Sequence, residues 1–77
     1  MQEIIINRDV VELFKILKFE ALATSGADAK AMIAAGEVMV NGEIETRKRR
    51  KITHNDVIEV FGQKYLVLTE PPESESN

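Results

Sequence analysis

Residues 25–51 read SGADAKAMIAAGEVMVNGEIETRKRRK, and this stretch decides how the chain folds. Thr24 or Ser25 is expected to cap a helix, because both are favoured N-cap residues, and Asp28 stands three positions after Ser25, as in a capping box. Gly36 predicts the end of that helix, because glycine readily adopts the left-handed conformation that closes many helices. The five residues from Arg47 to Lys51 are all cationic. We therefore expect a capped helix, a hairpin and then a basic segment.

The hairpin is indicated by Asn41-Gly42, because both central residues of a type I′ turn need positive φ. The flanking residues, Glu37 to Val40 and Glu43 to Thr46, then form its two strands. Side chains alternate between the faces of a strand. This alternation directs the valines of the first strand into the core. Glu43 and Glu45 of the second strand are expected to point into solvent.

The residues before this stretch predict a strand and a first helix. Glu3 to Ile6 is a β-branched run that suits a strand. Asp9 and Glu12 form a second capping-box pattern, so a helix is expected to begin there. Phe19 is expected to be buried beside the apolar stripe of that helix. The stripe recurs at helical spacing and contains Val10, Leu13, Phe14, Leu17 and Ala21.

The residues after the basic run predict a turn and a second pair of strands. Thr53 to Asp56 reads as the turn, and Val57 to Phe61 and Lys64 to Leu68 read as the strands. The expected fold class is α+β, with two short helices packed on a small antiparallel sheet. Residues 1–69 are expected to make a single domain, with no second domain. Residues 70–77 contain no apolar side chain and are expected to form a disordered acidic tail.

Composition excludes several classes of site. The 77 residues include no cysteine and one histidine, so neither a disulfide, a thiolate metal site nor a histidine cluster can form. No metal or cofactor is expected. Ser25 has no base that the sequence places beside it, and we expect no enzyme activity. No apolar run approaches the roughly 20 residues of a membrane span, and no signal peptide is evident. A soluble, cytoplasmic monomer is expected.

The charge distribution points to a polyanion partner. The formal net charge is −3, although five of the ten basic residues lie together between Arg47 and Lys51. The other 72 residues therefore carry five basic and thirteen acidic side chains, a net charge of −8. Positive charge gathered on one segment of an acidic protein is typical of a nucleic-acid contact.

Four segments resemble the small RNA-binding domain named after ribosomal small-subunit protein four. They are Leu22 to Ser25, Ala29 to Ile33, Gly36 to Gly42 and Asn55 to Val60. The segment Glu45 to Ile52 looks like that of small stand-alone bacterial members. The resemblance implies non-catalytic binding of structured RNA, such as rRNA or a tRNA-like fold, through the second helix, the hairpin and the basic loop. It also implies a bacterial setting and a ribosome or ribosomal precursor as partner.

Members of that family often carry arginines early in the second helix. This chain has Gly26 and Ala31 there, with Lys30 as the remaining cation, so the basic loop is expected to contribute more. If the loop is extended, Arg47 and Arg49 share one side, which we favour because guanidinium groups bind phosphates bidentately. The residues expected to contact RNA are Lys30, Arg47, Lys48, Arg49, Arg50 and Lys51. Those expected to support the surface are Ser25, Ala27, Asn41 and Gly42.

Other roles for the same residues stay open at this point. The basic loop can dock on an acidic partner protein, which would make the chain a protein–protein adaptor. It can also present RNA to a separate enzyme. Phe61 and Tyr65 are expected to pack rather than to stack on bases, so recognition should rest on phosphates and shape. His54 is expected to serve as a turn residue.

Overall fold

A computed structural model describes residues 1–70 of the chain. The predicted acidic tail lies outside this range except for Glu70, whose backbone N–H donates to the carbonyl of Ile6 at 2.8 Å. The elements are β1 (Gln2–Ile6), β2 (Val10–Glu12), α1 (Leu13–Phe19), α2 (Gly26–Ala34), β3 (Val38–Val40), β4 (Glu43–Ile44), β5 (Lys51–Thr53), β6 (Val57–Val60) and β7 (Gln63–Thr69).

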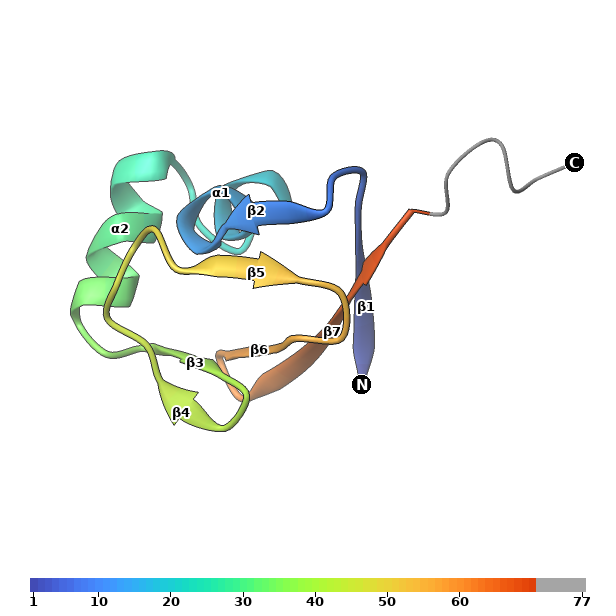
Figure 1. Cartoon of the computed structure of the whole chain (residues 1–77). Helices are drawn as coiled ribbons and strands as arrows, with labels where there is room; N and C mark the ends of the chain where they lie inside the picture. Colours follow the sequence, from blue (N-terminus) through green and yellow to red (C-terminus); the bar gives the residue numbers. More distant parts are fainter. Residues whose placement is uncertain (71–77) are drawn as a thin grey trace, which may run out of the picture.

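The strands form two sheets. The larger sheet has the order β1-β7-β6-β3-β4, and β2 and β5 pair separately beside α1 (Figure 1). The predicted α+β class is confirmed. All pairs are antiparallel apart from β1 and β7, which run parallel and place Ile4 opposite Val67. The sequence did not predict this parallel pair, because it joins the two ends of the described chain and no local signal specifies it.

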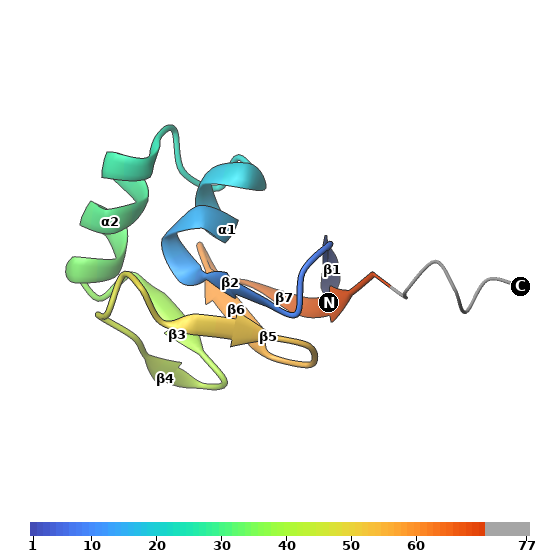
Figure 2. The same ribbon diagram turned by 45° about the horizontal axis from the view of Figure 1, so that its top comes forward.

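Both helices lie on one side of the larger sheet and close a single core against it (Figure 2). Alternating residues of the strands point into this core, and each helix contributes one apolar stripe. The buried hydrophobic residues are Ile4, Ile6, Leu13, Ile16, Leu17, Ala23, Ala29, Met32, Ile33, Val38, Val40, Ile52, Ile58, Val60 and Val67.

The predicted ends of α2 and the predicted hairpin turn are confirmed. Ser25 is the N-cap, and its Oγ accepts from the backbone N–H of Asp28 at 3.0 Å. Gly36 has φ +77° and its N–H donates to the carbonyl of Ile33, as in a Schellman motif. Asn41 and Gly42 have φ +53° and +85°, as a type I′ turn requires. These features form where the local sequence specifies them.

The predicted start of the first helix is wrong. Asp9 does not cap it; instead Val10–Glu12 forms β2, which pairs with β5, and α1 begins at Leu13. Glu12 occupies the N-cap position and its side chain makes no capping hydrogen bond. Two consecutive β-branched valines favour a strand once a partner strand is available. The pairing of β2 with β5 therefore prevails over the local capping-box pattern of Asp9 and Glu12.

The predicted burial of two phenylalanines is also wrong. Phe19 and Phe61 are each 67% exposed. Phe19 is the last residue of α1, and the chain then turns sharply at Ala21, which has φ +58°. This turn ends the helix before its apolar stripe is complete, so Ala21 is exposed as well. Val10 is also exposed, and it lies in β2 rather than in the helix. Tyr65 does pack against the core, as expected.

Candidate nucleic-acid interface

The basic segment is a turn, followed by the first residue of a strand. The backbone N–H of Arg50 donates to the carbonyl of Arg47 at 3.1 Å, and Lys51 begins β5. The basic segment is therefore not extended, because a turn reverses the chain between Arg47 and Arg50. The alternation of sides that an extended run would give does not apply to it. We call residues 47–51 the basic loop. Figures 1 and 2 both show the turn beside α2.

The main chain of the basic loop is bound to the start of α1. The N–H of Leu13 donates to the carbonyl of Arg50 at 2.8 Å, and the N–H of Phe14 donates to the carbonyl of Lys48 at 3.1 Å. The first N–H groups of a helix have no partner within the helix itself. Two of them are satisfied here by the loop. The same bonds hold the loop backbone in one place while its side chains stay outside.

A buried carboxylate lies beneath the basic loop. Glu45 is 6% exposed, so its predicted exposure is wrong, although Glu43 is exposed as expected. β4 ends at Ile44, and the N–H of Glu45 donates to the carbonyl of Val38 at 3.0 Å. This bond continues the register in which Val40 lies opposite Glu43, so it places Glu45 opposite Val38. Residues directly opposite each other share one face of an antiparallel pair, and Val38 is buried, so the Glu45 side chain lies on the buried face beneath the loop.

Glu45 binds two arginines of the basic loop. Arg47 donates to it through Nε at 3.0 Å, through Nη2 at 3.2 Å and through its backbone N–H at 3.1 Å. Arg50 donates through Nη1 at 2.6 Å. The side-chain hydrogen bond from Arg47 is the largest cause that lowers the pKa of Glu45, from its ordinary value of 4.5 to about 2, against the opposing effect of burial. The carboxylate therefore stays charged and orients both guanidinium groups.

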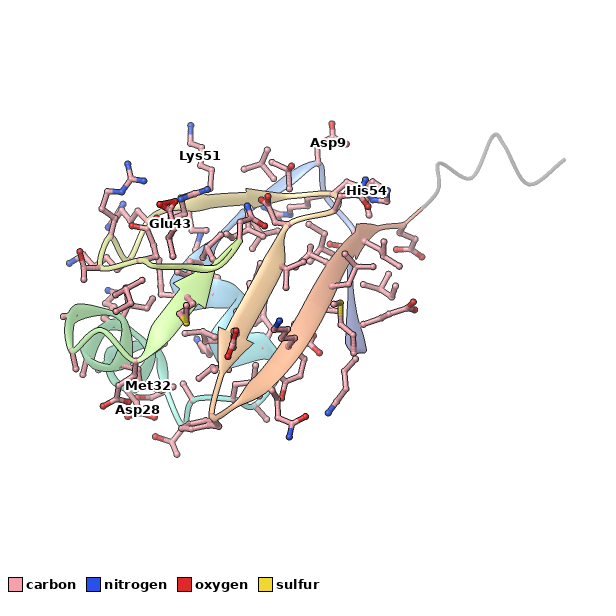
Figure 3. The ribbon with its side chains drawn as sticks, turned by 90° about the horizontal axis from the view of Figure 1, so that it is seen from below. Asp9, Asp28, Met32, Glu43, Lys51 and His54 are labelled. Carbon is pink, nitrogen blue, oxygen red and sulfur yellow. The ribbon has the colours of Figure 1, made fainter. Side chains whose placement is uncertain are left out.

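These bonds leave donors on both arginines. A guanidinium has five N–H donors, and Glu45 uses only part of each set. The side chain of Arg47 is 73% exposed and that of Arg49 is 68% exposed. Within residues 1–70, Lys48 and Lys51 have no carboxylate at ion-pair distance. Figure 3 shows Lys51 extending away from the body of the domain.

Lys30 of α2 is connected to the basic loop through Phe14. The Nζ of Lys30 lies 4.8 Å from the centre of the Phe14 ring, a distance at which a cation is attracted to the ring face. Because the N–H of Phe14 is bound to Lys48, one residue contacts both halves of the predicted surface. Ala27 and Ala31 are exposed on α2, and because their side chains are short, a large ligand can approach the helix closely beside Lys30.

Three of the expected supporting residues have structural tasks. Ser25 caps α2, and Gly42 completes the hairpin turn. Asn41 binds both β6 and the turn before it. Its Oδ1 accepts a hydrogen bond from the backbone N–H of Val57 at 2.9 Å, and its Nδ2 donates to the carboxylate of Asp56 at 3.1 Å. Asn41 therefore fixes the hairpin against the sheet, and its amide is already in use.

Sequence reasoning missed the roles of Glu45 and Phe14. Their roles depend on contacts with residues that lie elsewhere along the chain. The only local signal was that Glu45 precedes Arg47 by two positions. Among residues 1–70, no three His, Asp or Glu side chains gather as they would around a metal ion. In the same range, no helix is long and apolar enough to cross a membrane.

His54 lies in the turn between β5 and β6, as expected. Its Nδ1 accepts from the backbone N–H of Thr69 at 2.9 Å, so the ring connects this turn to the end of β7. This bond occupies one ring nitrogen with a structural contact. His54 is therefore accounted for without a role at the basic loop.

Comparison with known proteins identifies one family model and several relatives that match most of the chain. A model described as the S4 domain matches residues 4–68. YbcJ of Escherichia coli is 45% identical over 58 residues, which are 75% of this chain and 83% of YbcJ. The probable ribosome maturation protein RlbA of Bacillus subtilis is 36% identical over 57 residues, which are 74% of this chain and 80% of RlbA.

Two solved structures have folds similar to that of this chain. The solution structure of YbcJ, described as revealing an ALFAL motif involved in RNA binding, has a TM-score of 0.66 and 39% identity, over 88% of this chain and 87% of that one. The 30S ribosomal protein S4e of Thermoplasma acidophilum has a TM-score of 0.65 and 25% identity. The match covers 91% of this chain and 42% of the longer S4e chain.

Proposed function

Because the chain belongs to the S4 domain family, we propose that it binds structured RNA, without catalysis, through one surface made by α2 and the basic loop. The surface contains Lys30 and the five cations of residues 47–51. The likeness to YbcJ, whose solution structure is described as revealing a motif involved in RNA binding, supports RNA as the ligand. The likeness to RlbA and to protein S4e supports RNA of the ribosome or of its precursors.

The observation that carries this proposal is the anchoring of the basic loop. Its carbonyls accept from the first N–H groups of α1, and Glu45 orients Arg47 and Arg50 from below. Immobilising flexible cationic side chains at binding costs free energy, and side chains that are already oriented avoid part of that cost. A held turn with exposed cations therefore suits a phosphate backbone of defined shape better than a mobile basic tail does.

The first test uses a matched pair of charge reversals. Lys48→Glu changes an exposed cation of the basic loop, and Lys64→Glu changes an exposed cation of β7 by the same amount of charge. Lys48 makes no ion pair within residues 1–70, and its contact with α1 uses only its backbone carbonyl. RNA affinity is measured across a salt series, and folding is checked by circular dichroism.

We expect Lys48→Glu to weaken binding to a structured RNA by about tenfold and to reduce the slope of log affinity against log salt by roughly 0.7 to 0.9. Lys64→Glu should leave both quantities near the wild type. Equal effects of the two variants would show that net charge, rather than this surface, governs binding. Arg47→Glu is less suitable as a first test, because it places a second carboxylate beside Glu45.

A second test separates RNA from an acidic protein partner. RNA crosslinked to the tagged protein in its host is sequenced, with the Lys48→Glu variant as control. Enrichment of particular RNA segments that the variant loses would name the ligand. Association with a protein that survives ribonuclease treatment, with no enriched RNA, would contradict the proposal and favour the adaptor role.

A further inference from the structure

A groove of about 690 Å³ runs between β1, β2 and α1. Pockets that hold small ligands occupy a similar range, roughly 300 to 1,000 Å³. Three exposed apolar side chains line it: Ile5 is 55% exposed, Val10 41% and Phe19 67%. Single exposed apolar residues are common on protein surfaces, but a group of them around one groove indicates a binding site.

The polar lining of the groove carries more positive than negative charge. Four cations line it, against three carboxylates. One of these carboxylates, Glu12, is already paired with Lys15 at 3.2 Å and lies 3.9 Å from Arg49. The cations are Arg8, Lys15, Lys18 and Lys51, and the carboxylates are Glu12, Glu20 and Glu70. An apolar floor with cations beside it suits a ligand that is both flat and anionic.

The groove is continuous with the surface proposed to bind RNA. Lys51 lines the groove and also lines the hollow formed with Arg47, Arg49 and Arg50 of the basic loop. Phe14 lines the groove too, and its backbone N–H is bound to Lys48. A strand of RNA that leaves the basic loop at Lys51 therefore enters this groove directly.

Resting on the proposed function, we infer that the groove binds a single-stranded segment that extends from the structured RNA on the basic loop. Unpaired bases offer flat faces that stack on aromatic side chains, and cations along the groove neutralise the phosphates between them. Phe19 is the stacking residue, because its ring is the exposed aromatic in the groove that no cation covers among the described contacts. Stacking tolerates any base, so this subsite adds affinity without sequence preference.

The experiment compares one hairpin RNA with blunt ends and the same hairpin with a short oligouridine tail on its 5′ or its 3′ end. One of the two tails, on the end of the hairpin that faces the groove, should raise the affinity of the wild type about fivefold or more. This is the gain expected from stacking one base on an aromatic ring. Phe19→Ala should remove this gain and leave binding of the blunt hairpin unchanged. Phe61→Ala is the matched control, since Phe61 has the same 67% exposure but lies outside the groove. It should keep the gain.

The outcomes distinguish the two proposals. If the blunt hairpin binds and neither tail adds affinity in the wild type, the inference is overturned while the proposed function stands; a groove that serves a protein segment would give this result. Equal losses of the gain in Phe19→Ala and Phe61→Ala would also overturn it. If no hairpin binds the wild type, the proposed function fails, and the inference fails with it.

Discussion

The two helices begin in different ways. α2 is capped by its neighbours in the chain: Ser25 accepts from the N–H of Asp28, and the Asp28 carboxylate accepts from the N–H of Thr24. The first turn of α1 has no side-chain cap, and its N–H groups donate to carbonyls of the basic loop more than thirty residues later in the chain. The start of α2 is therefore fixed by residues beside it in the chain, whereas the start of α1 is fixed by residues that are distant in the chain.

Because α1 begins on the basic loop, the stability of α1 and the conformation of the candidate RNA surface depend on the same hydrogen bonds. A change at the cap of α2 is confined to α2. A change that releases the basic loop also removes the acceptors from the start of α1. The proposed RNA surface is therefore part of the framework that holds α1.

Glu45→Ala should destabilise the protein by about 2 kcal/mol, because several hydrogen bonds to one charged group are lost. Urea unfolding measures this, and hydrogen exchange locates it. Exchange at the amides of Leu13 and Phe14 should become faster, while that of Asp28 in α2 should not change. Glu43→Ala, two residues away and exposed, is the control and should have little effect. Unchanged exchange at Leu13 would show that α1 does not depend on the loop in this way.

Acid should weaken the same contact. The pKa of Glu45 is lowered to about 2 in the folded protein, from an ordinary value of 4.5, chiefly by the hydrogen bond from Arg47. A group with a depressed pKa stabilises the fold fully above its unfolded value and loses that contribution as the pH falls through its folded value. The stability difference between wild type and Glu45→Gln should therefore be constant near neutral pH and shrink between pH 4.5 and 2. A difference that stays constant through this window contradicts the ionised pair.

Ser25→Ala should cost about 1 kcal/mol, the usual effect of removing an N-cap side chain. Because this cap is local, exchange at the start of α2 should rise while the amides of Leu13 and Phe14 stay protected. RNA affinity should remain near the wild type, since Ser25 is proposed only to support the surface. A large loss of affinity in a folded Ser25→Ala variant would show that the residue contacts the ligand.

Ala21→Gly should stabilise the protein by about 0.5 kcal/mol. Ala21 ends α1 with φ +58°, a conformation that costs a residue with a Cβ about 1 kcal/mol and that glycine adopts freely. The greater entropy of glycine in the unfolded chain offsets part of that gain. Thermal unfolding measures the change. A lower melting temperature would show that the strain at Ala21 is smaller than the entropy cost of glycine.

The features that depend on neighbouring residues could be predicted from the sequence. Ser25, Gly36 and Asn41-Gly42 act within a few positions of themselves, and each lies where the local pattern predicts. The α+β class followed from these features and from the resemblance to the family. The position of positive charge was also evident, because Arg47 to Lys51 are adjacent in the chain.

How those charges are held depends on contacts between residues that are distant in the chain. β2 forms because β5 is there to pair with it, and β1 joins β7 across the whole described chain. Glu45 is buried because it lies opposite Val38 in the hairpin and is bound by Arg47 and Arg50, and Phe19 is exposed because α1 ends at that residue. Each outcome depends on which distant residues supply hydrogen-bond partners, and periodicity along a single segment carries no information about those partners.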